Sequence, residues 1–148
     1  MSTEGPKLDE VIYFLMDKAQ KASKKLSIKT FKDAGLEITL DQWVVLRRIY
    51  EEKSQTQIEL ARATLKDAAS ITRILDLLHS KNLVRRVPHE TDKRKSSLIL
   101  TNRGIETINQ AYAVVAELRA KGVEGITSEE LQIAKRVMNK IAQNMKSD

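Results

Sequence analysis

Apolar residues recur along most of this chain with the three- and four-residue spacing of an amphipathic helix, and one stretch, residues 83–100, breaks that period. Residues 83–87 and 97–100 are short and β-prone, and the charged run 89–95 separates them. This pattern predicts a β-hairpin with an extended polar tip. Because Pro88 has no N–H donor, we expect it where the strand ladder ends.

The segments on either side of residues 83–100 predict six helices. The first is expected from about Pro6 to Thr30, and the second opens at Thr39, where a hydroxyl and the amide of Gln42 have the spacing of a capping box. Four further residues can cap a helix N-terminus, with capping boxes at the first and last of them: Thr56, Asp67 (for a helix over 68–82), Thr101 and Thr127. Gly122 and Gly125 separate the last two helices.

The order of these elements predicts the fold class. Four helices, a hairpin and two more helices make a mostly α chain with a small β-hairpin wing, which is a winged helix-turn-helix. We expect a single domain over residues 6–147. Its winged lobe would cover about 39–104, and the helices of about 6–30 and 105–147 would form a homodimer, because their apolar stripes are longer than the small lobes could cover.

The net charge of +6 lies entirely in the central part of the chain. Residues 1–61 and 104–148 are each neutral overall, whereas residues 62–103 carry ten Lys and Arg against four Asp and Glu. Such a localised excess is typical of a surface that binds a polyanion, although a solvated basic face is the simpler alternative. The basic segment coincides with the fourth helix and the hairpin, so charge and architecture both favour binding to double-stranded DNA.

Two groups of side chains are candidates for DNA contact. Ser70, Thr72 and Arg73 lie off the apolar stripe in the first turns of the fourth helix, where a recognition helix needs small or hydrogen-bonding residues. At the hairpin tip, Arg94 could enter a narrow minor groove, and Asp92, two residues away, could orient its guanidinium. The alternatives are ordinary surface polar residues and an exposed charged turn.

At this point the sequence resembles the MarR family of transcriptional regulators (multiple antibiotic resistance regulators). The run 83–104, with Asp-x-Arg at its tip followed by a strand, Leu-Thr and Gly104, is similar to the family's wing; 39–46, 56–61 and 70–78 are similar to its second, third and fourth helices. Asn82 stands where a Gly is usual, and since Asn tolerates positive φ the turn should survive. Ala69 replaces a serine-like residue.

The resemblance implies an obligate dimer that straddles pseudo-palindromic DNA. Thr72 and Arg73 would then contact DNA from the recognition helix, Arg94 would be the minor-groove arginine supported by Asp92, and Thr56 and Gln57 would contact phosphates. Ser70 and three lysines of the basic segment, Lys66, Lys93 and Lys95, complete the expected interface. The function expected is a DNA-binding regulator, more specifically a repressor.

Many members of the family bind small aromatic or phenolic effectors near the junction of the two lobes. Tyr13, Trp43, Arg47 and Tyr112 could line such a cleft, or they could pack in the core and the interface. No cofactor is expected. His79 and His89 lack the spacing of metal ligands, so we interpret them as surface histidines and expect no metal site.

Other functions have less support. No phosphate-binding loop or nucleophile motif is present, so the sequence does not predict an enzyme. A dimeric winged-helix interaction module without DNA binding remains the main alternative. No run approaches eighteen apolar residues, and residues 1–10 do not resemble a signal peptide, so we expect a cytoplasmic protein that makes no membrane contact.

Overall fold

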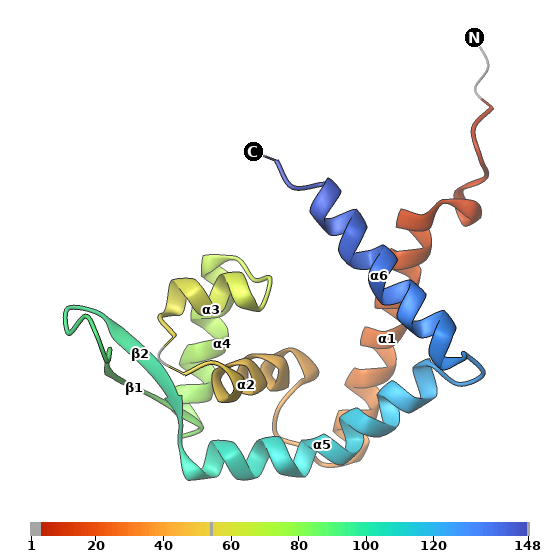
Figure 1. Cartoon of the computed structure of the whole chain (residues 1–148). Coiled ribbons are helices and arrows are strands. Elements are labelled where there is room, and N and C mark those ends of the chain that lie inside the picture. The colour runs from red at the N-terminus through yellow and green to blue at the C-terminus, as the bar shows by residue number, and fades with distance from the viewer. Residues whose placement is uncertain (1–3, 54, 148) are drawn as a thin grey trace. The chain divides into compact units, whose positions relative to one another are not determined.

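The computed structural model describes residues 4–53 and 55–147. The chain divides into two compact units, and the boundary between them lies between Val115 and Ala116. The first unit contains α1 (Ile12–Asp33), α2 (Leu40–Glu51), α3 (Gln57–Ala63), α4 (Ala68–Ser80), β1 (Val84–Pro88) and β2 (Ser96–Leu100), in the order expected from the sequence (Figure 1). α5 (Asn102–Gly122) begins in this unit and ends in the second, which also holds α6 (Ser128–Asn144).

The first helix differs from its predicted bounds. A 3-10 turn, Leu8–Glu10, comes first, and α1 begins at Ile12 instead of near Pro6. The reason is local: Val11 has extended backbone angles (φ −83°, ψ 124°), which interrupt the helical path between the two segments. At its other end α1 continues past Thr30 to Asp33.

The core of the first unit is built where α2, α3, α4, the hairpin and the start of α5 meet. Each element contributes side chains that are almost wholly buried, as their helical or alternating spacing predicts. They include Trp43, Leu46, Leu60, Leu75, Leu78, Val84, Leu98 and Ile108. α4 is therefore held by its apolar face, and its Ser70, Thr72 and Arg73 face is left outside the core.

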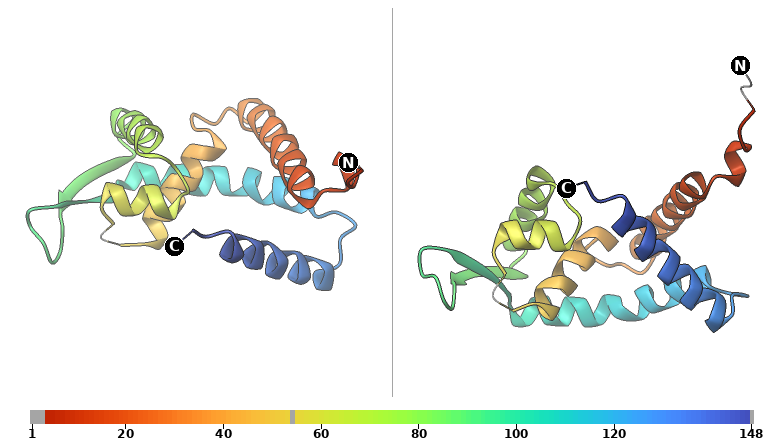
Figure 2. Two further views of the ribbon diagram at one scale, coloured as in Figure 1. Left: turned by 90° about the horizontal axis from the view of Figure 1, so that it is seen from above. Right: turned by 45° about the horizontal axis from the view of Figure 1, so that its top comes forward.

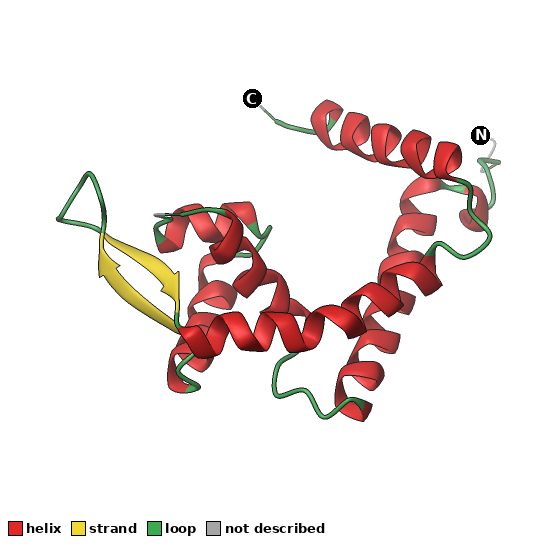
Figure 3. Ribbon diagram, turned by 60° about the horizontal axis from the view of Figure 1, so that its bottom comes forward, coloured by secondary structure: helices red, strands yellow, loops and turns green. Residues whose placement is uncertain are grey.

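The hairpin is antiparallel, with a register that runs from Val84 opposite Leu100 to Pro88 opposite Ser96 (Figure 3). Pro88 is in the last pair, as expected for a residue without an N–H donor. The backbone N–H of Leu98 also donates to the carbonyl of Gln55 (3.0 Å), which attaches the α2–α3 connection to the hairpin. Both views of Figure 2 show the loop that joins the two strands at the end of the hairpin farthest from the helices.

Three helices of the first unit end in the same backbone cap, a Schellman motif. After α1, α3 and α4 the chain passes through a residue with positive φ: Gly35 (69°), Leu65 (58°) and Asn82 (58°). In each case the next N–H reaches back to a carbonyl in the last turn of the helix, for example Lys66 to Ala61 at 2.9 Å. The sequence predicted the turn at Asn82 but not the one at Leu65.

Predicted N-terminal caps are present on the helices. Thr39 and Thr127 form complete capping boxes with Gln42 and Glu130. At Thr56 the described contacts include only the first of the two capping-box bonds, from the N–H of Glu59. Asp67 and Thr101 form the remaining two caps. The Asp67 carboxylate accepts a hydrogen bond from the backbone N–H of Ser70 (2.7 Å), and the Thr101 hydroxyl accepts one from the backbone N–H of Gly104 (3.0 Å).

In the second unit α6 carries an apolar stripe along one face. None of its residues is buried; Ile133, Met138 and Met145 just beyond it are 49%, 37% and 68% exposed. Gly125 (φ 77°) makes the turn that leads into it. Within the described parts of the chain, no helix has the length and apolar character to cross a membrane.

Candidate nucleic-acid interface

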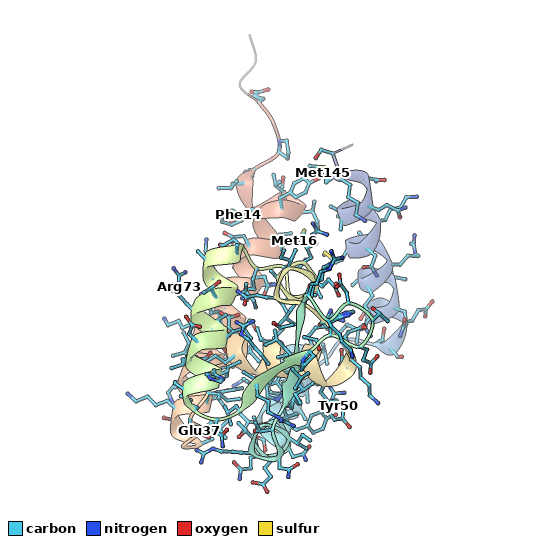
Figure 4. The ribbon with its side chains drawn as sticks, turned by 90° about the vertical axis from the view of Figure 1, so that its left-hand side faces the viewer. Phe14, Met16, Glu37, Tyr50, Arg73 and Met145 are labelled. Carbon is cyan, nitrogen blue, oxygen red and sulfur yellow. The ribbon has the colours of Figure 1, made fainter. Side chains whose placement is uncertain are left out.

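The first turns of α4 present three polar side chains that the sequence singled out. Thr72 and Arg73 are exposed and Ser70 is half-buried, because Ile71 and Leu75 take the inner face of the helix. Figure 4 shows the Arg73 side chain on the outer side of α4. The helix therefore offers hydrogen-bonding groups to whatever meets this face.

Asp67 organises two of these side chains. Its carboxylate caps α4 by accepting from Ser70 N (2.7 Å) and also accepts from the Ser70 hydroxyl (3.1 Å). Ser70 Oγ in turn accepts from the Arg73 guanidinium at 3.3 Å. The hydrogen bonds from Ser70, first of all, hold the pKa of the Asp67 carboxyl below its ordinary value, and the charge of Arg73 adds to this. Arg73 thus has a preferred direction before any ligand binds.

Thr72 belongs to a second set of hydrogen bonds, which joins three elements. The Gln57 amide at the start of α3 donates to Thr72 Oγ1 (2.8 Å), and its carbonyl oxygen accepts from the Arg86 guanidinium of β1 (2.7 Å). The Thr72 hydroxyl donates to the carbonyl of Ala68 (2.8 Å). Its single proton is therefore used within the helix, and toward a ligand Thr72 can only accept a hydrogen bond.

Arg86 is a residue that the sequence pattern does not single out. Its signal was weak, because β1 carries two adjacent arginines and the strand pattern alone does not say which one faces α3. The exposed Arg86 lines a cavity of about 310 Å³ together with Thr56, Gln57, Lys95 and other residues of α3 and β2. The fold thus brings Thr56, Gln57 and Lys95 to one place, which the sequence could only group by resemblance.

The charge of Lys66, which lies in the connection between α3 and α4, has a partner. Its Nζ lies 2.9 Å from the Asp41 carboxylate at the start of α2, and its side chain is 22% exposed. The DNA contact expected of Lys66 is not tested by this geometry and stays a prediction.

The hairpin tip carries the remaining candidates. Asp92 Oδ1 accepts from the backbone N–H of Arg94 (3.1 Å) and from its Nε (3.2 Å), so the carboxylate orients the guanidinium as the sequence analysis expected. Arg94 is 91% exposed, and Lys93 and Lys95 beside it are exposed as well. The hydrogen bond from the Arg94 side chain, and after it the one from the Arg94 backbone, holds the pKa of the Asp92 carboxyl below its ordinary value. Contact of this tip with DNA remains a prediction.

The four residues proposed for an effector are in different environments. Trp43 is 2% exposed and donates from Nε1 to the carbonyl of Ile108 (3.3 Å), as a core residue does. Arg47 forms an ion pair with Glu51 (2.9 Å) and lies over the ring of Tyr50. Tyr13 on α1 and Tyr112 on α5 are about half exposed. For Trp43 the alternative of core packing fits better, and an effector site at the other three remains untested.

A larger cavity, of about 540 Å³, lies between α1 and the start of α2, with Lys24, Ser27, Thr39 and Lys66 among its lining residues. None of the four effector candidates belongs to that lining. Across residues 4–53 and 55–147, no three His, Asp or Glu side chains are grouped closely enough to hold a metal ion.

Comparison with known proteins agrees with this geometry. Residues 38–96 match the family model of the MarR family. A mutant of MarR from E. coli, solved in complex with operator DNA, superposes with a TM-score of 0.78 at 26% identity, covering 93% of this chain and 99% of that one.

Two further structures share the fold. S. aureus MepR in a DNA complex has a TM-score of 0.82 at 19% identity, covering 93% of this chain and 99% of its own. A probable transcriptional regulator from Pseudomonas aeruginosa has a TM-score of 0.76 at 23% identity, covering 91% and 99%. The winged-helix fold expected from the sequence is confirmed.

Proposed function

We propose that this chain, whose residues 38–96 match the model of the MarR family, is a homodimeric transcription regulator that binds pseudo-palindromic double-stranded DNA. In this family the fold serves DNA binding and not catalysis, so we assign the chain no enzymatic role. Its location would then be that of its DNA target, in the cytoplasm.

The observation that carries the proposal is that hydrogen bonds already hold three polar side chains of α4. Ser70 and Arg73 are oriented by Asp67, and Thr72 is oriented by Gln57, all on the side of α4 that faces away from the core. Side chains that are already ordered lose less entropy when they pair with base edges. The positively charged hairpin tip, with the almost fully exposed Arg94, would add a contact to the minor groove.

A homodimer is supported by exposed apolar residues at both ends of the chain. In the N-terminal segment Leu8, Ile12 and Leu15 are 63%, 41% and 40% exposed, and α6 leaves a comparable stripe uncovered. A second copy of the chain is the occupant we propose, because exposed apolar residues gathered on both terminal segments are typical of a protein–protein contact. Sedimentation at micromolar concentration should show a dimer, and a folded, soluble monomer would contradict it.

The finer parts of the proposal are repression and release by an effector. A dimer that covers an operator blocks access to it, and a small aromatic molecule bound near Tyr13 or Tyr112 would alter the spacing of the two lobes. Titration of the DNA complex with phenolic acids tests the second point. Failure of every such compound to change affinity would remove the effector from the proposal and leave DNA binding intact.

The decisive experiment is selection of bound sequences from a random DNA pool, followed by affinity measurement over a range of salt. We expect a two-fold symmetric site with half-sites about 34–36 Å apart and log K falling several units per decade of salt. Lys29→Ala, outside the basic segment 62–103, is a matched control that removes one positive charge and should leave affinity nearly unchanged. No enrichment at low salt would instead favour the alternative, an interaction module without DNA binding.

A further inference from the structure

His89 begins the loop of the hairpin tip, and its imidazole ring faces the backbone of that loop. Nδ1 lies 3.3 Å from the backbone nitrogen of Thr91 and 3.2 Å from that of Asp92, and it is also 3.2 Å from the Thr91 hydroxyl. His89 is half-buried although it lies close to the exposed tip. The contacts therefore go beyond those of the surface histidine that the sequence suggested.

The direction of these hydrogen bonds fixes the charge of the ring that can make them. A backbone N–H can only donate, so Nδ1 must accept with its lone pair, and the ring must be neutral with its proton on Nε2. A protonated ring carries N–H at both nitrogens. Nδ1–H would then oppose the N–H groups of Thr91 and Asp92 and break both bonds.

These bonds connect His89 to the arginine at the tip. The N–H of Asp92 is held by the His89 ring, and the Asp92 carboxylate holds the guanidinium and the backbone N–H of Arg94. Two backbone hydrogen bonds close the same loop: Lys95 N–H donates to the carbonyl of Asp92 (3.0 Å), and His89 N–H donates to the carbonyl of Lys95 (3.1 Å). Arg94 itself is almost fully exposed, so its orientation depends on Asp92.

We propose that His89 is a positioning residue for DNA binding: its neutral ring orders the loop that aims Arg94, and protonation of the ring releases that loop and weakens binding. The inference rests on the proposed function, because Arg94 is taken as a DNA contact. It adds a residue to the interface and a dependence on pH that a wing without this histidine would lack.

The charged groups around His89 bear on the sign of the effect. Asp92, Glu90 and Lys95 belong to the same loop, and Lys53, after α2, lines with Glu90 the cavity beside Pro88. The two carboxylates favour a protonated ring, while the lysines and the two N–H donors favour a neutral one. DNA phosphates would favour protonation too. A histidine that acted only through its charge would therefore strengthen binding as the pH falls, whereas the positioning role predicts the opposite.

Two variants of His89 separate these possibilities. In His89→Asn the Oδ1 atom has the position of Nδ1, accepts the same N–H groups and does not titrate. In His89→Ala the acceptor is lost at every pH. The chain has one other histidine, His79. Its ring nitrogen Nδ1 contacts the carbonyl of Val84 in β1, outside the loop of the tip. His79→Gln is therefore the matched control.

The experiment measures affinity for the selected DNA site at pH 8 and pH 5.5 at constant salt. We expect the unmodified protein and His79→Gln to bind about two- to tenfold more weakly at pH 5.5, the range carried by one hydrogen bond. His89→Asn should bind like the unmodified protein at pH 8 and keep that affinity at pH 5.5. His89→Ala should be weaker by a similar factor at both values.

A double-mutant cycle tests whether the effect passes through Arg94. If it does, His89→Ala should cost little in an Arg94→Ala background. Binding that strengthens on acidification, equal pH dependence in His89→Asn, or additive effects of the two alanine variants would overturn the inference.

A measurement without DNA distinguishes this failure from failure of the proposed function. Nitrogen-15 NMR should show an unprotonated Nδ1 at pH 8, and the Thr91 and Asp92 amide signals should shift with the titration of His89. If those signals do not follow the ring, the inference is wrong even when DNA binds. If they do follow it and no duplex binds, the loop is ordered as described but the proposed function, and with it the positioning role, fails.

Discussion

Leu65 allows a test of backbone strain inside the helix-turn-helix. It is the residue with positive φ (58°) in the cap that ends α3, and its side chain is 94% exposed. A left-handed conformation costs an L-residue with a β-carbon about 1–2 kcal/mol, and Gly and Asn much less. The same cap uses Gly35 after α1 and Asn82 after α4, so the chain itself shows which residues suit this position.

The magnitude follows from these two observations. Because the Leu65 side chain is almost fully exposed, its removal costs little burial energy, and the change in strain decides the sign. Leu65→Asn should stabilise the fold by about 1 kcal/mol. Leu65→Gly should stabilise it by about 0.5–1 kcal/mol, since the greater freedom of Gly in the unfolded chain offsets part of the relief. Leu65→Ala keeps the strained β-carbon and should change stability by less than about 0.5 kcal/mol.

Urea denaturation at one fixed protein concentration is the suitable assay, because the midpoint of the proposed dimer would depend on concentration. The three variants are compared by their midpoints at equal m-values. Destabilisation by both Leu65→Asn and Leu65→Gly would refute the reasoning. Equal stabilisation by Leu65→Ala would also refute it, because the effect would then come from the loss of the exposed side chain and not from the backbone.

Three further predictions concern α4, α5 and the hairpin tip. The pKa of the Asp67 carboxyl is lowered from 3.8, so its charged form contributes stability that is present above about pH 4 and is lost as the pH falls through the folded pKa. In acid titrations the stability of the unmodified protein should therefore decline below about pH 4 relative to Asp67→Asn. Gly104→Ala should destabilise the fold by about 1–3 kcal/mol in thermal unfolding, because the added β-carbon would overlap the carbonyl of Leu83; a neutral result would contradict this packing. Arg94→Ala should weaken binding to all DNA sequences, and Asp92→Ala should do so less; wild-type affinity in both would exclude the tip as a contact.

Much of the fold could be predicted because it depends on neighbours in the sequence. The caps at Thr39, Asp67 and Thr127 involve residues three positions apart, and the turn at Asn82 needs only a residue that accepts positive φ. The Asp92–Arg94 pair spans two residues and was expected for the same reason. The MarR resemblance added the interface residues, and residues 38–96 match the model of that family.

Contacts between elements could not be predicted in this way. Gln57 reaches Thr72 fifteen residues later and Arg86 twenty-nine residues later, and only the packing of α3 against α4 and the hairpin brings them within hydrogen-bond distance. The same holds for Lys66, whose charge meets Asp41 across the lobe. Trp43 shows the limit for the apolar residues: its spacing fits both a core and a cleft, and burial decides for the core.

The sequence by itself thus determined the helices, the hairpin and the site of the positive charge, because periodicity, caps and turn residues act over a few neighbouring positions. Tertiary structure alone decided which polar groups are already engaged. It left the Thr72 hydroxyl as an acceptor, paired the Arg86 guanidinium with Gln57, and turned the His89 ring toward the loop of the tip. The physical reason is that a hydrogen bond requires atoms within about 3 Å of each other, and for residues on different elements that proximity is set by the buried core that holds the elements together.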